Sequence, residues 1–323
     1  MKLQILVPQY NEDESIIKPL LDSIAIQIKV DFSEIGVIIV NDGTDCLLDV
    51  NFLKSYPFQI DYYEKRHEGV SAARNFALDM ATADYVMFCD ADDMFYKING
   101  LWMVMKEINK GFDCLISLFY EEWKHPETGD FYFIEHSADS VFVHGKVHRL
   151  QYLRDNNIRW NNSLTIHEDS YFNTLSINLT TDVKYQKNGF YLWRYRENSI
   201  CRHDPKYILK TYKNLLDSND ALVDEFIERG KIKEANLYAS MMILEAYYNM
   251  NKSEWLDQMN SEYRNETERR FKDYFLKHEQ RWRDLDEKER MEISERLRAR
   301  NAKEGMLIES IGLNEWLEHI KTL

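Results

Sequence analysis

The sequence predicts an α/β fold with a largely parallel sheet, followed by an all-α region. Through residue 204, short apolar or β-branched runs alternate with amphipathic helical segments, a pattern that is typical of right-handed βαβ units. From Pro205 onward, helix-forming segments follow one another, and glycine and proline become scarce. We therefore expect two domains, residues 1–204 and 205–323.

The first part of the chain contains four predicted strands, each followed by a helix. Apolar runs predict the strands at 3–7, 35–40, 59–64 and 85–89. Helical spacing of apolar residues, or a run of small residues, predicts helices at 13–28, at 46–54, from Gly69 onward and at 97–110. Large apolar residues fill the fourth strand, as is typical of an interior parallel strand.

The next segments predict further strands, a hairpin and two helices. We expect strands at 114–120, 181–185 and 189–195, a hairpin turn at Gly129-Asp130, and helices at 146–155 and from Thr165 onward. The C-terminal region predicts helices at 207–227, 235–250, 255–277 and 288–300. The charge-dense run 262–300 is interpreted as a solvated helix pair; a homo-oligomer surface is the less favoured alternative, because clean heptads are lacking.

Composition limits the function and the cellular compartment. Acidic residues outnumber basic ones 55 to 41, which argues against a general nucleic-acid or anionic-membrane binder but permits a local basic pocket. The four cysteines are scattered without a CxxC pair, which suits a reducing cytoplasm. Neither a signal peptide nor an apolar run of about 18 residues is visible. We expect a cytoplasmic protein without a transmembrane segment, with peripheral association at the inner membrane face as an addition.

The strand predicted at 85–89 ends in three carboxylates, Asp90, Asp92 and Asp93. Ligands of open α/β sheets bind beyond the carboxyl ends of the strands. Clustered carboxylates repel one another, so they are usually gathered around a cation. The alternative is a solvated acidic turn that binds nothing.

Five motifs in order resemble the inverting glycosyltransferase family 2, which has the GT-A fold. They are Val7-Pro8-Gln9-Tyr10-Asn11, Ile38-Ile39-Val40-Asn41-Asp42-Gly43-Thr44-Asp45, Gly69-Val70-Ser71-Ala72-Ala73-Arg74-Asn75, Asp90-Ala91-Asp92-Asp93 and His167-Glu168-Asp169-Ser170-Tyr171-Phe172. The resemblance implies a Rossmann-like mixed sheet flanked by helices. It fades at 110–145 and stops near residue 204.

The resemblance also implies a reaction. Such enzymes move a sugar from a nucleoside diphosphate, here a UDP-sugar, to an acceptor hydroxyl with inversion. A cell-surface glycan, a teichoic acid or a glycolipid is the expected acceptor. By resemblance, Asp92 binds Mn²⁺ or Mg²⁺ at the diphosphate, and Asp90 faces either the ribose hydroxyls of the nucleotide or the water shell of the metal. His203 is a further candidate metal ligand, with an ordinary surface histidine as the commoner reading. Asp93 either contacts the donor sugar or caps the following turn, and the cap is the favoured interpretation.

The nucleotide site is carried over from the first three motifs. Pro8 and Tyr10 are expected to shape the cleft, and Asp42 to accept a hydrogen bond from the uracil N3–H. Arg74 and Asn75 are expected to reach the uridine or its phosphate. The structural alternative for Arg74 is an ion pair with Asp42 or Asp90.

The last motif supplies the expected general base, Asp169, with Glu168 orienting the acceptor or raising the basicity of Asp169. The alternative for Asp169 is an N-cap or first-turn acid of a helix. The segment after the last predicted strand concentrates positive charge beside this site and suits a diphosphate. Its candidate residues are Arg194, Arg196, Ser199 and Arg202.

Two positions depart from the family pattern and leave the base specificity open. His67 stands where the family usually has Asn, and Asp45 follows Thr44 without the usual Ser-Thr pair. A nucleotidyltransferase of the same fold is disfavoured, because the loop after the first strand is acidic and lacks glycine. A non-catalytic sugar binder would be expected to lose Asp92 or Asp169, and both acids are present.

Overall fold

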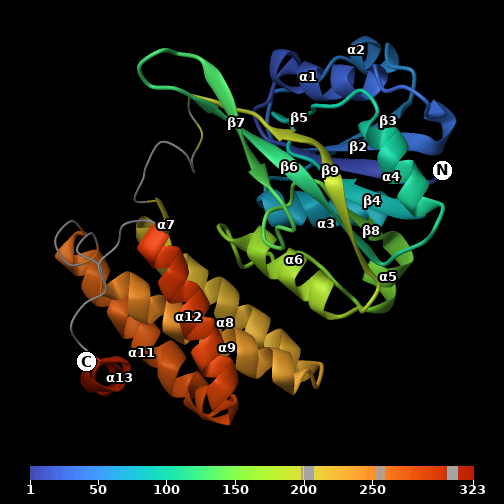
Figure 1. Cartoon of the computed structure of the whole chain (residues 1–323). Coiled ribbons are helices and arrows are strands. Elements are labelled where there is room, and N and C mark those ends of the chain that lie inside the picture. The colour runs from blue at the N-terminus through green and yellow to red at the C-terminus, as the bar shows by residue number, and fades with distance from the viewer. Residues whose placement is uncertain (198, 200–206, 252–254, 256–258, 304–311) are drawn as a thin grey trace. The chain divides into compact units, whose positions relative to one another are not determined.

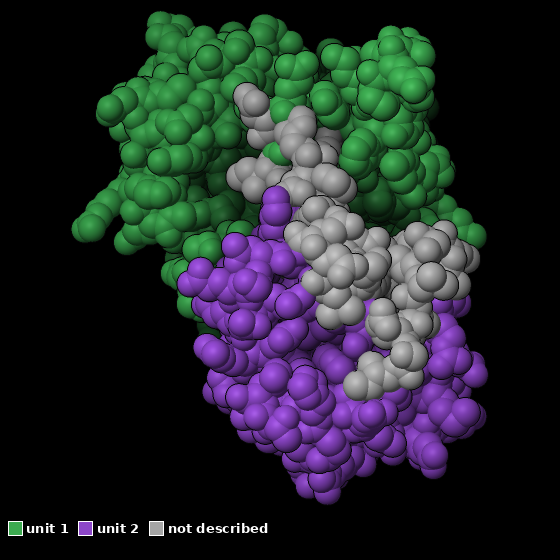
Figure 2. Space-filling view, turned by 90° about the vertical axis from the view of Figure 1, so that its left-hand side faces the viewer, with its two compact units in different colours: residues 1–199 green, residues 200–323 purple. Residues whose placement is uncertain are grey.

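The computed structural model describes residues 1–197, 199, 207–251, 255, 259–303 and 312–323. The chain divides into two compact units, Met1–Ser199 and Ile200–Leu323, which are coloured separately in Figure 2. The boundary predicted near residue 204 lies outside the described residues. The two units are described separately below.

Within the described residues, the first unit is built on a nine-stranded sheet in the order β3-β2-β1-β4-β8-β6-β9-β5, with β7 paired to β6 (Figure 1). The parallel half comprises β1 (Leu3–Gln9), β2 (Ile35–Asp42), β3 (Gln59–Lys65) and β4 (Tyr85–Phe88). The other half comprises β5 (Met94–Phe95), β6 (Cys114–Lys124), β7 (Phe131–His136), β8 (Lys146–Arg149) and β9 (Val183–Trp193). Because β8 runs antiparallel to β4 and β6, the sheet is mixed rather than largely parallel.

Helices flank the sheet and follow the local signals of the sequence. They are α1 (Glu14–Ala25), α2 (Val50–Lys54), α3 (Val70–Met80), α4 (Gly100–Ile108), α5 (Leu150–Asp155) and α6 (Glu168–Asn178). Asp13 caps α1 by accepting hydrogen bonds from the backbone N–H groups of Ser15 and Ile16. The apolar face of α1 packs into the core beneath β1 and β2, which fixes the strand ends that carry the site.

Two predictions about the half of the sheet that contains the antiparallel pairs were wrong, and one strand there was missed. Residues 146–149 form strand β8 instead of the start of a helix, because they pair with both β4 and β6. The two strands predicted at 181–195 are one strand, β9, whose register with β6 shifts between Ser117 and Phe119. The two-residue strand β5 was not predicted, since so short a run has no detectable period.

Gly189 marks the irregular stretch of β9 and gives a stability prediction. A Cβ added at Gly189 would stand 2.5 Å from the carbonyl oxygen of Leu118, a backbone atom that cannot move alone. We expect Gly189→Ala to lower the free energy of unfolding by about 1–3 kcal/mol, measured by urea denaturation. Gly312→Ala is the control, because a Cβ there meets nothing within 4 Å. Equal midpoints for the two variants would contradict this interpretation.

The second unit is all-α, as predicted. Its described helices are α7 (Tyr207–Lys210), α8 (Tyr212–Glu228), α9 (Ile232–Met250), α11 (Ser261–Asp284), α12 (Glu287–Lys303) and α13 (Leu313–Thr322), of which α13 was not predicted. Aromatic side chains such as Tyr212, Phe271 and Trp316 fill its core. Among the described residues, no helix combines the length and the apolar character needed to cross a bilayer.

Candidate active site

The carboxyl ends of β1, β2 and β4 meet at one edge of the sheet. The three strands are parallel and adjacent, with β1 between its neighbours. This topology brings together Tyr10 after β1, Asp42 at the end of β2 and Asp90 after β4, although they are far apart in the sequence. The edge is where an α/β sheet ordinarily binds its ligand.

The three carboxylates after β4 have different surroundings. The side chains of Asp90 and Asp92 are 33% and 30% exposed. Asp93 is buried, and it accepts hydrogen bonds from the Tyr191 hydroxyl at 2.5 Å and the Arg194 backbone N–H at 3.0 Å. Burial, followed by the charges of Asp92 and Asp90, raises the pKa of Asp93 well above its usual value. Asp93 therefore ties the loop after β4 to β9, which corrects its interpretation as a turn cap.

Arg74 of α3 connects the two acidic motifs. Its guanidinium is buried and donates to Asp90 Oδ1 and to Glu168 Oε1, both at 2.9 Å. The same group lies 4.4 Å from the ring centroid of Trp160. The ion pair with Asp90 that the sequence left as an alternative is present. One indole ring and two carboxylates hold this guanidinium in one orientation.

Asp169 lies in the first turn of α6, beside Glu168. The N-cap of α6 is His167, in the left-handed region at φ 63°, so Asp169 is a first-turn acid and not the cap. Its Oδ1 accepts the N–H of Ser170 at 2.8 Å. Burial, followed by the neighbouring charge of Glu168, raises the pKa of Asp169 to about 7, while Arg74 opposes that shift. A carboxylate with this pKa is suited to proton transfer near neutral pH.

Asp42 organises the loop between β3 and α3. Its buried carboxylate accepts from Lys65 Nζ and the Gly69 backbone N–H, each at 2.8 Å, and from the Glu68 N–H at 3.1 Å. The imidazole Nδ1 of His67 lies 2.9 Å from its Oδ2. Both oxygens therefore have partners inside the protein in this conformation.

Two exposed rings lie next to that loop. Tyr10 stacks on His67 with ring centroids 4.6 Å apart and an angle of 29° between the planes. Pro8 precedes them near the end of β1. Stacked, solvent-accessible rings at a sheet edge are suited to a planar base. The departure of His67 from the family pattern thus adds a ring to this surface.

Asn75 is committed to the protein interior. Its amide nitrogen donates to the Trp160 carbonyl at 2.8 Å and to Asn162 Oδ1 at 3.0 Å, while its own oxygen accepts the Trp160 N–H at 3.0 Å. Asn75 therefore fixes the segment that carries Trp160 behind Arg74.

The basic segment after β9 returns to the acidic loop. Arg196 donates to Asp92 Oδ2 at 2.8 Å, and Arg194 donates to the Asp92 carbonyl at 3.2 Å. The Ser199 N–H donates to the Arg196 carbonyl at 3.2 Å. Arg202 and His203 lie outside the described residues. The sequence predicted positive charge beside the site for a diphosphate; in the structure, Arg194 and Arg196 contact the loop that carries Asp92, and their role at a diphosphate stays a prediction.

Three site neighbours were missed from the sequence. Tyr191 bonds to Asp93 from 98 positions away, and Trp160 lies over Arg74. Glu12, in the loop after β1, has a pKa raised mainly by burial and in part by the charge of Asp92. Because these contacts join distant parts of the chain, no local pattern pointed to them.

Carboxylates and histidines that could hold a metal gather in two places among the described residues. Asp90, Asp93 and His144 have ligand atoms within 4.8 Å of one another, as do Asp220, Asp224 and His278. In the second group, Asp220 already accepts from Arg270, Lys277 and His278, and these bonds lower its pKa although burial alone would raise it. The second group is therefore an ion-pair network with its charge already balanced.

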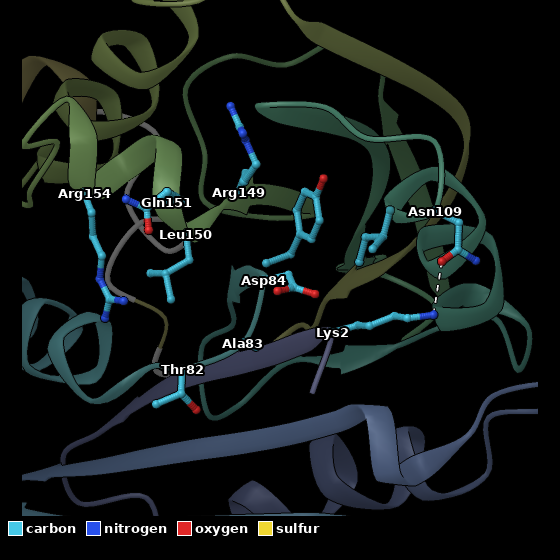
Figure 3. Close-up of a pocket in the computed structure, with 11 residues that line it drawn as sticks. Lys2, Thr82, Ala83, Asp84, Asn109, Arg149, Leu150, Gln151 and Arg154 are labelled. Atoms are coloured by element: carbon cyan, nitrogen blue, oxygen red, sulfur yellow. Dashed lines mark hydrogen bonds between the residues drawn. The ribbon is translucent and has the colours of Figure 1, made fainter.

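A cavity of about 460 Å³ lies at the opposite edge of the sheet, beside the amino ends of β1 and β4 (Figure 3). Lys2, Arg149 and Arg154 line it. Lys2 pairs with Glu34 at 3.0 Å, Arg149 pairs with Asp113, and Arg154 donates to the Ala81 carbonyl at 2.8 Å. These three side chains already have partners within the protein. The acids of the family 2 motifs lie at the other edge of the sheet, so this cavity is not the candidate active site.

Comparisons with known proteins identify the family of the chain and proteins that share its fold. The sequence profile described as "Glycosyl transferase family 2" matches residues 4–167. Glycosyltransferase GlyA of Streptococcus pneumoniae is 26% identical over 225 residues, which are 62% of this chain and 32% of GlyA. The minor teichoic acid biosynthesis protein GgaB of Bacillus subtilis is 33% identical over 93 residues, 28% of this chain and 10% of GgaB.

Solved structures share the fold. S. aureus TarS 1–349 in complex with UDP-GlcNAc is 18% identical with a TM-score of 0.64, covering 85% of this chain and 81% of TarS 1–349. The complex with UDP gives a TM-score of 0.62 at 17% identity. The chain spans less than two fifths of the length of the curated relatives that it matches. Because the family profile covers half of the sequence, including the first four motifs and His167 at the start of the fifth, the chain belongs to glycosyl transferase family 2, the glycosyltransferases of GT-A fold.

Proposed function

We propose that residues 1–204 form the catalytic domain of an inverting, metal-dependent glycosyltransferase that moves a sugar from a UDP-sugar to an acceptor hydroxyl. One observation carries the proposal: Arg74 holds Asp90, next to the expected diphosphate site, and Glu168, next to the expected base. The two ends of an in-line displacement, the leaving group and the attacking hydroxyl, would then be positioned by one rigid guanidinium.

Asp90 and Asp92 fit a hard divalent cation better than the cluster of Asp90, Asp93 and His144. Both oxygens of Asp93 have donors, and His144 packs among aromatic rings. The carboxylates of Asp90 and Asp92 are partly exposed, and the arginine that each one accepts from, Arg74 or Arg196, donates to one of its two oxygens. One or two carboxylates together with substrate phosphates are the usual ligands of Mg²⁺ and Mn²⁺. A bound ion of this kind would act as a Lewis acid that neutralises the diphosphate leaving group.

The residues of the chain supply the remaining steps. Asp169, ionised above pH 7, accepts the proton of the acceptor hydroxyl as that oxygen attacks the anomeric carbon. Attack from the face opposite the diphosphate inverts the configuration. Arg196, which donates to Asp92 in this structure, would turn toward the diphosphate oxygens when the donor binds. Three other residues of this segment remain candidates for binding the diphosphate: Arg194, Ser199 and Arg202. His203 remains a candidate metal ligand.

The donor and acceptor classes rest on chemistry and on relatives. The stacked rings of Tyr10 and His67 would pack against the base, and TarS, which has this fold, binds UDP and UDP-GlcNAc. Asp42 would accept a hydrogen bond from the uracil N3–H only after one of its present donors had moved away. Asn75 would act indirectly, by fixing the backbone of Trp160, whose ring lies over Arg74. GgaB supports a teichoic acid, cell-surface glycan or glycolipid as acceptor. Self-association through the C-terminal helices remains a prediction.

Asp92→Ala tests the metal assignment. We expect Mn²⁺ to increase the UDP affinity of the wild type. In the variant this increase should be smaller by at least about tenfold, because one carboxylate ligand of the ion is gone. Isothermal titration with UDP, with and without Mn²⁺, measures this effect. Asp84→Ala, which removes an exposed acid at the opposite edge of the sheet, is the control.

Two outcomes would overturn the assignment. An Asp92→Ala variant that keeps the full effect of Mn²⁺ would show that another group holds the ion. Wild-type protein that binds UDP equally well without Mn²⁺ and hydrolyses no UDP-sugar would favour a non-catalytic binder of nucleotide sugars.

A further inference from the structure

An exposed apolar patch lies on the first unit, on the segment after α1 and the segment before α4. Ile26, Ile28 and Ile98 have 59%, 43% and 52% of their surface exposed. The Ile28 N–H donates to the Ile98 carbonyl at 2.8 Å, so the segment after α1 and the segment before α4 are held together. Contiguous apolar patches on a soluble domain usually mark an interaction surface.

The patch continues onto the β6–β7 hairpin, which extends beyond the rest of the sheet (Figure 1). Tyr96, two residues before Ile98, contacts the rings of Tyr120 and Phe133 at centroid distances of 5.1 and 5.2 Å. Phe131 and Phe133 are 55% and 42% exposed and, by the alternation of a strand, share one side of β7. Aromatic side chains thus extend the isoleucine patch along the hairpin.

Lysines surround this patch, although the chain is acidic overall. Segments 26–30 and 96–106 contain Lys29, Lys97 and Lys106, while the net charge of the chain is −14. The acids that directly follow these segments have partners of their own: Asp31 accepts from Ser33, and Glu107 pairs with Lys110 at 2.7 Å. Lys29 Nζ and Lys106 Nζ lie 5.0 and 4.7 Å from the Trp102 ring, and Lys97 Nζ lies 5.3 Å from the Tyr120 ring. On the hairpin, Glu135 is an acid on the same side as Phe133. The positive charge is therefore concentrated around the isoleucines and Trp102.

We propose that this surface docks the enzyme on an anionic lipid bilayer. We call it the lysine–isoleucine face and define it by Ile26, Ile28, Lys29, Tyr96, Lys97, Ile98, Trp102, Lys106, Phe131 and Phe133. Lysines are attracted to anionic headgroups, while isoleucine and aromatic side chains enter the interfacial region. The inference rests on the proposed function only insofar as a lipid-linked acceptor would be presented at such a surface.

Charge favours lipid over a second copy of the chain as the occupant. A two-fold contact through this face would bring the same patch of both copies together, and with it the lysines of both copies. Like charges in contact oppose association, whereas phosphate headgroups neutralise them. The net negative charge of the chain argues against general adsorption to anionic membranes, but it is compatible with binding through the lysine–isoleucine face alone.

The test is sedimentation of the full chain with vesicles. We expect binding to vesicles of phosphatidylcholine mixed with phosphatidylglycerol, weaker binding at high salt, and little binding to phosphatidylcholine alone. Lys29→Glu combined with Lys106→Glu should weaken binding by on the order of tenfold or more, at about fivefold per lysine. Ile26→Ser, Ile28→Ser and Ile98→Ser together should also reduce sedimentation.

Matched controls separate this surface from general effects. Lys18→Glu with Lys54→Glu removes the same charge elsewhere on the unit, and Val50→Ser with Met80→Ser removes exposed apolar residues outside the face. Thermal unfolding and UDP-sugar hydrolysis in solution should match the wild type in every variant. Absence of wild-type binding to the mixed vesicles, or equal losses in test and control variants, would overturn the proposal. A wild-type dimer that the triple serine variant converts to a monomer would replace lipid by a second copy.

Discussion

Asp169→Asn is expected to lower turnover about 10²- to 10⁴-fold while leaving UDP affinity unchanged. The substitution keeps the shape of the side chain but removes the carboxylate that would accept the proton. In the wild type, burial and the neighbouring Glu168 raise the pKa of Asp169 to about 7. Only the ionised form accepts a proton, so kcat/KM should rise with pH and level off above about pH 7.

Release of UDP from the donor, measured across pH, checks both parts of this prediction. The variant should lose the acid limb of the pH profile as well as the rate, because the group that titrates is gone. Titration with UDP and Mn²⁺ provides the control, since Asp169 has no assigned contact with the nucleotide. Wild-type turnover in the variant would remove Asp169 from the mechanism, and an unchanged pH limb would assign that limb to another group.

Arg74→Ala is expected to destabilise the protein by about 3–5 kcal/mol and to abolish transfer. The buried guanidinium is the shared partner of Asp90 and Glu168, so its removal leaves the largely buried Glu168 and the partly exposed Asp90 without their common cation. The contact with Trp160 is lost as well. Arg74→Lys should recover part of the stability but little activity, because an ammonium does not present two parallel donors in one plane.

Urea unfolding of Arg74→Ala and of Arg159→Ala gives a matched comparison. Arg159 also pairs with a carboxylate, Asp79, but both side chains are exposed, so its loss should cost no more than about 1 kcal/mol. If the two variants lost the same stability, the ion pairs of Arg74 would contribute no more to the free energy of unfolding than an exposed pair does. Transfer activity retained by Arg74→Ala would remove it from the positioning of the site.

Local patterns predicted most of the parallel half of the fold. Continuous apolar runs gave β1, β2 and β4 to within a few residues, and Asp13 marked the start of α1. Strand β8 was missed because Lys146–Arg149 has a helical neighbour in α5 and is a strand only through its pairing with β4 and β6. Pairing with distant strands overrides local propensity, which is why the antiparallel half was less predictable.

The sequence by itself determined the family, the mixed α/β architecture and the sheet edge at which Asp42, Asp90 and Asp92 gather. These follow from short-range information: apolar periodicity, turn residues and motifs placed directly after strands. Only the tertiary structure decided the partners, such as Arg74 with Glu168, 94 positions apart, and Asp93 with Tyr191, 98 positions apart. Such contacts depend on how whole strands and helices pack, and a residue's neighbours in sequence carry no information about them.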